Sequence, residues 1–394
     1  MTRMVGTVVR GIRTPIVKEG DNIVEIAVDS ILTATKNDGF ELREKDVVGI
    51  TESLVARAQG NYAKLSDIAS DVNSKFTGDI AVVFPILSRN RFSALLQGIA
   101  ASGKKIYLFL NYPSDEVGNQ LMDIAVMDDK ALNPYTDVLT EAQYRQLFGE
   151  EVLHPFTGID YVRYYRQLIG DKLEIIFTND PREVVKYSKE VIVANIHERF
   201  RTKSIIEKAG ASKVCTLDEL LASSINGSGF NPQYGLLGSN KATADTVKLF
   251  PRDCKQVVEA VQAQLWAKTG KKIEVMIYGD GAFKDPVGKI WELADPVVSP
   301  GFTDGLKGLP NEIKIKYIAD NEFKNLSMDE MTAAMKVKIN TKATSLVGSD
   351  ATLGTTPRQL TDLLGSLCDL TSGSGDKGTP VVLVQGYFDN YATD

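Results

Sequence analysis

The chain has 394 residues, of which 43% are hydrophobic and 24% are charged, and its formal net charge is −6. This length allows about two globular domains of an ordinary soluble composition. The negative balance argues against a general nucleic-acid-binding surface, and no apolar run approaches the roughly 18 residues that cross a bilayer.

Cysteine and histidine usage narrows the possible chemistry. The three cysteines lie far apart and match neither a zinc-binding nor a disulfide pattern. The N-terminus carries no signal-peptide pattern, so we expect a reducing, cytoplasmic location. The two histidines, His154 and His197, are too far apart in sequence to act as a local ligand pair. A metal site would therefore rely on oxygen ligands, which favours magnesium or manganese over zinc.

The first 60 residues are predicted to contain two strands and a helix. Residues 3–10 and 46–55 have the apolar, β-branched composition of strands. Apolar residues at helical spacing predict a helix from Asn22 to Thr35. Between the first strand and this helix, Pro15 and Gly20 mark a loop with the sequence RTPIVKEGDN.

Residues 62–225 change to repeated strand-then-helix units, which predict an inserted α/β domain with a mostly parallel sheet. The segment 113–170 between these units is polar and mixed, and it receives no assignment. The predicted strands are 78–86, 104–113, 173–178 and 190–196, and the predicted helices include 89–102, 181–190 and 202–210.

From residue 226 the composition and the spacing of apolar residues change again. Residues 226–242 are rich in glycine and asparagine and are predicted to form a long loop. An amphipathic helix, 253–270, then leads into a buried strand from Ile273 to Tyr278. Further helices are predicted near 328–337 and 357–370, and the sequence VVLVQGY predicts a last strand.

The buried strand Ile273–Tyr278 ends in Gly279-Asp280-Gly281. Glycine on both sides allows a sharp turn and a close ligand approach. A carboxylate in this position is suited to hold a divalent cation and, through it, phosphate oxygens. Asp285 is a candidate to share that ion. The alternative is an ordinary turn, because Asp-Gly is also a common turn signal.

Residues Ser372 to Gly378, SGSGDKG, form a second candidate phosphate loop. Successive glycines let backbone N–H groups point into one concavity, and Lys377 adds positive charge. The spacing of a P-loop is absent, and a flexible connector before the last strand is the alternative reading.

Arg89 and Arg91 lie where a predicted strand leads into a helix, which is the edge of a parallel sheet where ligands bind. Both are candidates to hold a carboxylate or phosphate, and exposed surface charge is the alternative. His197 follows another strand and is a candidate general base, although such a histidine is more often structural. Cys215 is predicted to be a buried thiol.

Five segments, taken in order, resemble the coenzyme F-420:L-glutamate ligase (gamma-glutamyl ligase) family. RTPIVKEGDN is similar to the family's L-P-L-I-K-E-G-D loop, and TESLVARAQG to its S-T-V-I-S-K-A-E-G segment. GSGFNPQYGLLGSN with TVKLFPRD resembles A-N-A-G-I-D-x-S-N and L-L-P-x-D. EVMIYGDGAF resembles V-I-I-T-D-T, and SGSGDKGTPVVLVQG resembles G-x-G-x-G-I-P-V-V-V-R-G.

The resemblance implies an α/β ligase core formed by residues 1–61 and 226–394, with residues 62–225 as an insertion that affects acceptor choice. It implies an amide-bond-forming, EC 6.3.2-type enzyme that adds L-glutamate to a carboxylate acceptor such as coenzyme F-420-0. It also implies GTP as co-substrate, Mg²⁺ or Mn²⁺ with K⁺ as a further ion, a homodimer, and an acyl-phosphate intermediate. A folate-like acceptor is equally compatible with these motifs, and the choice of GTP over ATP rests on the family alone.

The resemblance also assigns residues to sites. A nucleotide is expected to contact four parts of the chain: the loop before the first helix, the segment TESLVARAQG, one asparagine and the glycine-rich loop. The residues are Thr14, Pro15, Ile16, Val17, Glu52, Ser53, Arg57, Asn240, Ser372, Gly373, Ser374, Gly375, Asp376, Lys377 and Gly378. Asp280, Gly281 and Asp376 match the metal positions.

The chain departs from the family pattern at three of these positions. Arg57 replaces a lysine, Gly281 lacks a threonine hydroxyl, and Leu237 occupies the position of a metal-binding aspartate. Leucine cannot bind a cation, so a nucleotide- or metabolite-binding protein without turnover is an alternative. A third possibility is a small-molecule enzyme whose site lies in the insertion near Arg89, Arg91 and Asp115.

Overall fold

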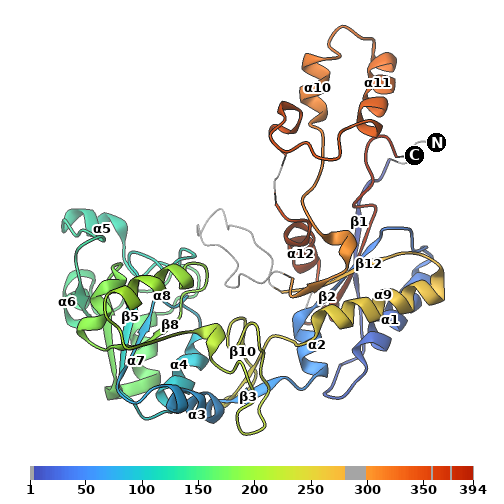
Figure 1. Ribbon diagram of the computed structural model, residues 1–394. Helices are drawn as coiled ribbons and strands as arrows, with labels where there is room; N and C mark the ends of the chain where they lie inside the picture. Colours follow the sequence, from blue (N-terminus) through green and yellow to red (C-terminus); the bar gives the residue numbers. More distant parts are fainter. Residues whose placement is uncertain (1–3, 280–298, 356–357, 373–374, 394) are drawn as a thin grey trace.

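The computed structural model describes residues 4–279, 299–355, 358–372 and 375–393. Asp280, Gly281, Asp285, Gly373 and Ser374 lie outside these ranges. The described chain is a mixed α/β protein with a five-stranded core sheet, a six-stranded sheet and a small three-stranded sheet between them (Figure 1). The predicted α/β fold class is confirmed.

The core sheet joins strands from both ends of the chain. Its two central strands, β2 and β12, are parallel, with Glu274 opposite Val47 and Tyr278 opposite Thr51. The other pairings are antiparallel. The strand order is β1 (Val8–Ile12), β14 (Val381–Gln385), β2 (Val47–Thr51), β12 (Glu274–Tyr278) and β13 (Gly301–Phe302).

Alternating side chains give this sheet two buried faces. Val48 and Ile50 of β2 pack with helices α1 (Ile23–Asp38) and α9 (Cys254–Thr269). Val47 faces the opposite side, where it packs in one cluster with Leu364 and Cys368 of α12 (Leu360–Thr371). Helices on both faces explain why these strands are almost continuously apolar.

The insertion contains the mostly parallel sheet that was predicted, in the order β6-β7-β5-β4-β8-β9, and β6 is antiparallel to its neighbour β7. Its strands are β4 (Ile80–Val83), β5 (Ile106–Leu110), β6 (Leu139–Thr140), β7 (Leu173–Phe177), β8 (Glu190–Val193) and β9 (Lys213–Thr216). Its helices are α3 (Leu65–Lys75), α4 (Phe92–Ala100), α5 (Ile124–Asp129), α6 (Glu141–Phe148), α7 (Tyr161–Ile169) and α8 (Arg199–Lys208), with 3₁₀ turns η1 (Gly170–Lys172), η2 (Pro181–Lys186) and η3 (Leu217–Glu219).

The small sheet connects the two parts of the chain. Its order is β10 (Asn240–Lys241), β11 (Thr246–Lys248) and β3 (Tyr62–Lys64), all antiparallel. Its buried side chains Ala63 and Val247 belong to the same apolar cluster as the six-stranded sheet. Hydrophobic packing therefore continues from the insertion into residues beyond 225. The domain limits 62 and 225 stay a prediction.

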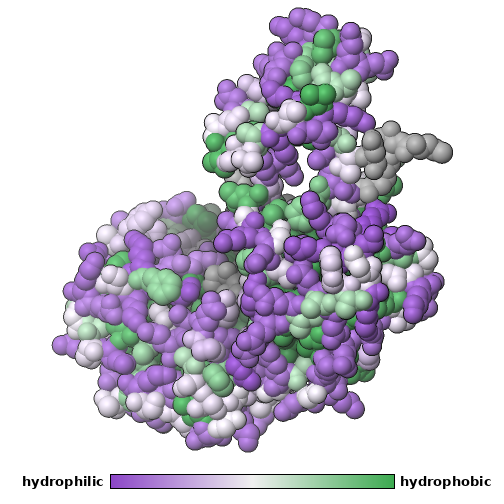
Figure 2. Space-filling model, turned by 45° about the vertical axis from the view of Figure 1, so that its right-hand side comes forward, coloured by the Kyte–Doolittle hydropathy of each residue, from purple (hydrophilic) through white to green (hydrophobic). Residues whose placement is uncertain are grey.

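The segment after β13 forms a projection. It contains the 3₁₀ turn η4 (Asp304–Leu306), helices α10 (Ile315–Asn321) and α11 (Met328–Asn340), and the turn η5 (Asp350–Thr352). The two helices have a small apolar cluster of their own, made by Ile318, Met335 and Ile339. This hairpin stands away from both large sheets (Figures 1 and 2).

Three sequence-based assignments differ from the structure. The strand predicted for 46–55 ends at Thr51, and helix α2 (Glu52–Ala58) follows, because Val55, Ala56 and Ala58 bury one helical face. The helix predicted for 181–190 is the short 3₁₀ turn η2. The unassigned segment 113–170 contains the whole of α5, α6 and α7. Within the described residues, no helix is long and apolar enough to cross a membrane.

Gly49 of β2 should not tolerate a side chain. A Cβ added there would lie 2.5 Å from the Cys368 sulfur and 3.2 Å from a Tyr278 ring carbon. We expect Gly49→Ala to lower the free energy of unfolding by about 1–3 kcal/mol, because a packed core resists extra volume. Urea unfolding measures this change. Gly6→Ala is the control, since no atom lies within 4 Å of its added Cβ, and an equal loss in both variants would contradict the explanation.

Candidate ligase site

A cavity of about 790 Å³ lies at the carboxyl ends of β2 and β12. Parallel pairing places Thr51 beside Tyr278, so Gly279 and the start of α2 meet at one edge. Ser372, after α12, completes this side. The cavity is lined by Lys18, Glu19, Thr51, Glu52, Ser53, Arg57, Tyr62, Asn90, Arg91, Asn240, Lys241, Ala242, Thr243, Thr246, Lys248, Gly279, Asp369 and Ser372.

The other wall of the cavity comes from the insertion and the small sheet. Asn90 and Arg91 precede α4, while Asn240 and Lys241 form β10. The backbone N–H of Lys241 donates to the Asn90 carbonyl at 2.6 Å, which ties β10 to this loop. The cavity thus lies between the core sheet and the inserted domain.

Among the described residues that line this cavity, positively charged side chains outnumber carboxylates. Five lining side chains are cationic, namely Lys18, Arg57, Arg91, Lys241 and Lys248. Three are carboxylates, namely Glu19, Glu52 and Asp369. An excess of lysine and arginine in a concave site favours phosphate and carboxylate ligands.

A buried ion pair joins α2 to β11 at the cavity. The Lys248 ammonium lies 2.8 and 3.0 Å from the two carboxylate oxygens of Glu52. Each residue is only 7% exposed. Sequence reasoning missed Lys248, although a lysine flanked by the apolar Val247 and Leu249 in a short strand is a signal for a partnered buried charge.

Arg57 positions the loop that precedes α1. Its Nε donates to the Val17 carbonyl at 2.5 Å, and the N–H of Gly20 donates to the carbonyl of Ala58. Val17 is buried in the apolar cluster of the core sheet, whereas Ile16 is 84% exposed. The predicted nucleotide loop is therefore held against α2 through its backbone.

The predicted nucleotide residues divide between two cavities. Glu52, Ser53, Arg57, Asn240 and Ser372 line the 790 Å³ cavity. A second cavity, about 1210 Å³ in volume, lies along α1. Of the predicted residues it is lined by Thr14, Pro15 and Lys377.

The remaining residues of the glycine-rich loop that the structure describes are exposed. Gly375, Asp376 and Gly378 line neither cavity. Tyr278 marks where this loop meets the core: its hydroxyl lies beside Ser372 and close to the Pro380 carbonyl. Burial raises the pKa of Tyr278 well above its ordinary value, so this phenol stays neutral.

The metal positions stay predictions. Asp280 and Gly281 lie outside the described residues, and Asp376 is exposed. Among the residues that the structure describes, no group of three His, Cys, Asp or Glu side chains is arranged to hold a metal ion. Three described carboxylates, Glu19, Glu52 and Asp369, line the cavity together with Gly279, and carboxylate oxygens are the ligands that magnesium and manganese prefer.

Leu237, at the position of the family's aspartate, does not face this cavity. It is 1% exposed and packs in the apolar cluster of the inserted domain. The leucine is thus accounted for by apolar packing. A carboxylate placed there would be buried among leucines, which makes restoration of a metal site by Leu237→Asp unsuitable.

Only one of the two arginines that were predicted to bind substrate lines the cavity. Arg91 lines the cavity, whereas Arg89 is exposed and does not line it. His197 is exposed and also lies outside the lining, and its backbone N–H donates to Glu116. Cys215 is buried, as predicted, and burial raises its thiol pKa.

Asp115 and His154 are structural. Asp115 accepts from the backbone N–H groups of Leu87, Val117 and Asn119. His154 is buried beside Asn119, and burial lowers its pKa. Neither side chain lines the 790 Å³ cavity.

Comparison with known families identifies the core. The model of the F420-0:Gamma-glutamyl ligase family matches residues 11–386, nearly the whole chain. The chain belongs to the F420-0:gamma-glutamyl ligase family. No curated protein matches the chain. The family match includes every segment that lines the 790 Å³ cavity, which we therefore call the ligase cavity.

Removing one partner of the Glu52–Lys248 pair should be costly, because it leaves the other charge buried. We expect Lys248→Met to lower the free energy of unfolding by about 3 kcal/mol, because it removes the cation beside a buried carboxylate. The double variant Glu52→Gln with Lys248→Met should recover a large part of that loss. Chemical denaturation of both variants measures the coupling, and a single variant as stable as the native chain would refute it.

Proposed function

We propose that this protein is a GTP- and divalent-metal-dependent ligase that adds L-glutamate to a carboxylate acceptor such as coenzyme F420-0. The family match supports the class of reaction. The observation that carries the finer proposal is the ligase cavity, which joins Glu52, Ser53, Arg57, Asn240 and Ser372 with Gly279, the residue before Asp280.

The chemistry explains why such a cavity needs cations. A carboxylate is a poor electrophile at neutral pH, so its oxygen first attacks the γ-phosphorus of GTP and GDP leaves. The glutamate amine then attacks the acyl-phosphate carbon, phosphate leaves with its bonding electrons, and the amine loses a proton. Arg57, Arg91 and Lys241 line this cavity, and in our proposal they bind the phosphates and the acceptor carboxylate.

The expected metal would be held from Asp280 with help from Glu52 or Asp369. When bound, a divalent cation would offset the negative charges that are crowded together on the phosphates. Both Glu52 carboxylate oxygens already accept from the Lys248 ammonium, so Glu52 would take this role only by exchanging that contact for the cation. A homodimer, a potassium ion and a cytoplasmic location remain predictions that follow from the family resemblance and from cysteine usage.

A second candidate is a nucleotide-binding protein that has lost turnover. The burial of Leu237 in an apolar cluster supports it, because no carboxylate stands at that family position. This candidate keeps nucleotide affinity but releases no phosphate.

Arg57 should decide nucleotide affinity. We expect Arg57→Met to weaken GTP binding in the presence of Mg²⁺ by roughly 10- to 100-fold, as for the loss of one charge-assisted contact to phosphate. Isothermal calorimetry measures this, with ATP compared in parallel. Arg182→Met is the matched control, because the Arg182 side chain is 71% exposed and pairs with Asp180 far from the cavity lining. Equal affinities in all three proteins would contradict the site.

Turnover distinguishes the two candidates. Purified protein with GTP, Mn²⁺ or Mg²⁺, L-glutamate and coenzyme F420-0 should release phosphate and form a product heavier by one glutamyl residue. Phosphate detection and mass spectrometry measure both. Asp280→Asn should reduce phosphate release at least tenfold, because one charged metal ligand becomes neutral. GTP binding without phosphate release under every metal condition would favour the second candidate.

A further inference from the structure

A small apolar pocket of about 30 Å³ adjoins the ligase cavity. Most of its walls are aliphatic or aromatic, and Ser88, Arg91 and Ser239 are the polar exceptions. Its lining is Ile86, Ser88, Arg91, Phe92, Leu95, Ala194, Ile196, Leu217, Leu236, Leu237, Gly238 and Ser239. A volume of this size exceeds the roughly 10–15 Å³ that one water needs and suits a short apolar group.

The pocket lies where the inserted sheet is topologically suited to bind a ligand. The chain runs from β4 to β5 and β7 on one side, and then returns to β8 on the other side of β4. The strand order therefore reverses between β4 and β8. Ile86 follows β4, and Ala194 and Ile196 follow β8, so the pocket is at the carboxyl ends of these strands. Open parallel sheets bind ligands at such switch points.

A buried polar atom in the pocket has no partner among the residues that the structure describes. Ser239 is 2% exposed, and its hydroxyl makes no hydrogen bond to them. Asn195, which follows β8, also has a buried side-chain oxygen without a hydrogen-bond partner. Buried polar groups are normally satisfied, because desolvation without a hydrogen bond costs free energy. An unpartnered hydroxyl in a pocket wall points to a ligand atom that completes it.

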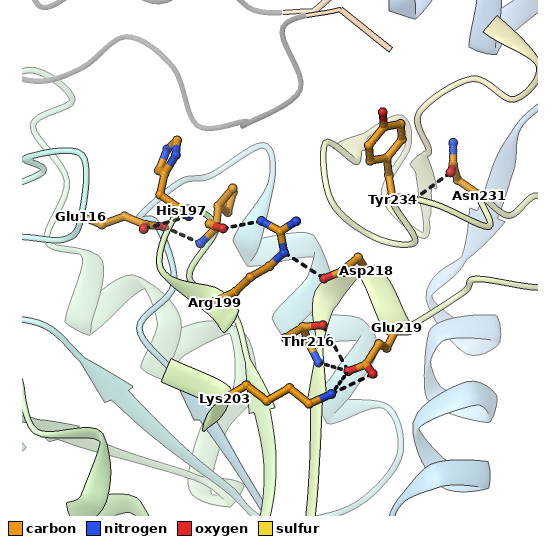
Figure 3. Close-up of polar contacts among 10 residues, drawn as sticks. Glu116, His197, Arg199, Lys203, Thr216, Asp218, Glu219, Asn231 and Tyr234 are labelled. Atoms are coloured by element: carbon orange, nitrogen blue, oxygen red, sulfur yellow. Dashed lines mark hydrogen bonds and ion pairs between the residues drawn. The ribbon is translucent and has the colours of Figure 1, made fainter. Parts of the chain in front are cut away.

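Polar contacts hold the pocket walls in place (Figure 3). The Glu116 carboxylate accepts from the N–H groups of Ile196 and His197. Arg199 donates to the Ile196 carbonyl and lies 3.2 Å from the Asp218 carboxylate. These contacts anchor the segments after β8 and β9 that contribute Ile196 and Leu217. The pocket is thus shaped by a fixed framework rather than by surface side chains.

The pocket and the ligase cavity share one lining residue. Arg91 lines both, and Ser239 of the pocket is followed directly by Asn240 of the cavity. A ligand with its carboxylate at Arg91 would extend its carbon chain toward Ser239. The site would then have a cationic group, Arg91, at one end and apolar walls at the other.

We propose that this pocket selects the acceptor: a carboxylic acid that carries a short branched apolar group and, beside the branch, one hydrogen-bonding atom that pairs with Ser239. The inference rests on the proposed ligase function for the fate of the carboxylate. The pocket itself is tested by binding alone, so the pocket and the ligase function can be refuted independently.

The binding test compares two probes in the full-length protein without nucleotide. The probes are 4-methylpentanoate and 4-hydroxy-4-methylpentanoate, with acetate as the carboxylate without a branch. Both branched probes should shift the methyl NMR signals of Leu217, Leu236 and Leu237, and acetate should not. The hydroxylated probe should bind about three- to tenfold more tightly, as expected for one added hydrogen bond to Ser239.

Two variants and a control test the residues. Ser239→Ala should remove the advantage of the hydroxylated probe without lowering the melting temperature, because the native hydroxyl has no partner to lose. Ala194→Val should fill the pocket and weaken both branched probes roughly tenfold. Ser188→Ala is the matched control: its hydroxyl donates to the Asp79 carbonyl, so this variant should melt at a lower temperature and bind both probes normally.

The results separate the pocket from the ligase activity. Equal affinities of the two branched probes in the native protein, or an unchanged difference in Ser239→Ala, would overturn the proposal. Methyl shifts spread over the surface instead of the pocket would overturn it as well. Pocket binding by a protein that releases no phosphate from GTP would refute the ligase function and leave the carboxylate pocket standing.

Discussion

The parallel pairing of β2 with β12 is the constraint on which the rest of the site depends. These strands are more than 200 residues apart in sequence, and their register sets Thr51 beside Tyr278. Both carboxyl ends therefore open at one edge, where α2 begins and where the chain enters Gly279. The apolar faces of β2 bury against α1 and α9 on one side and α12 on the other, so the edge is held by packing from two directions.

The inserted domain contributes residues to the cavity at this edge. Its apolar cluster continues into Leu236, Leu237 and Val247, residues that follow the insertion in sequence. The small sheet carries Lys248 from this cluster to Glu52 of the core. The buried ion pair thus joins the small sheet, which packs in the apolar cluster of the inserted domain, to α2 of the core, and Arg91 lines the ligase cavity between them.

The position of Leu237 shows how a family resemblance and a structure inform each other. Sequence comparison placed a missing metal ligand there, which suggests a weakened site. The structure shows an apolar residue with apolar neighbours, in the wall of a pocket that shares Arg91 with the ligase cavity. The change at Leu237 therefore belongs with acceptor binding in our proposal, while any metal depends on Asp280 and its carboxylate neighbours.

The sequence by itself determined the fold class, the mostly parallel inserted sheet and the family, because strand and helix periodicities and ordered motifs are local properties. It also drew attention to Glu52, Arg57, Asn240 and Ser372, which the structure brings to one cavity. It could not determine that α2 begins at Glu52, since burial of one helical face decides that boundary. Nor could it determine the partner of Glu52, the separation of Thr14 from the ligase cavity, or the unpartnered Ser239 hydroxyl. Those features arise from contacts between residues that are distant in the chain, and only the tertiary structure sets them.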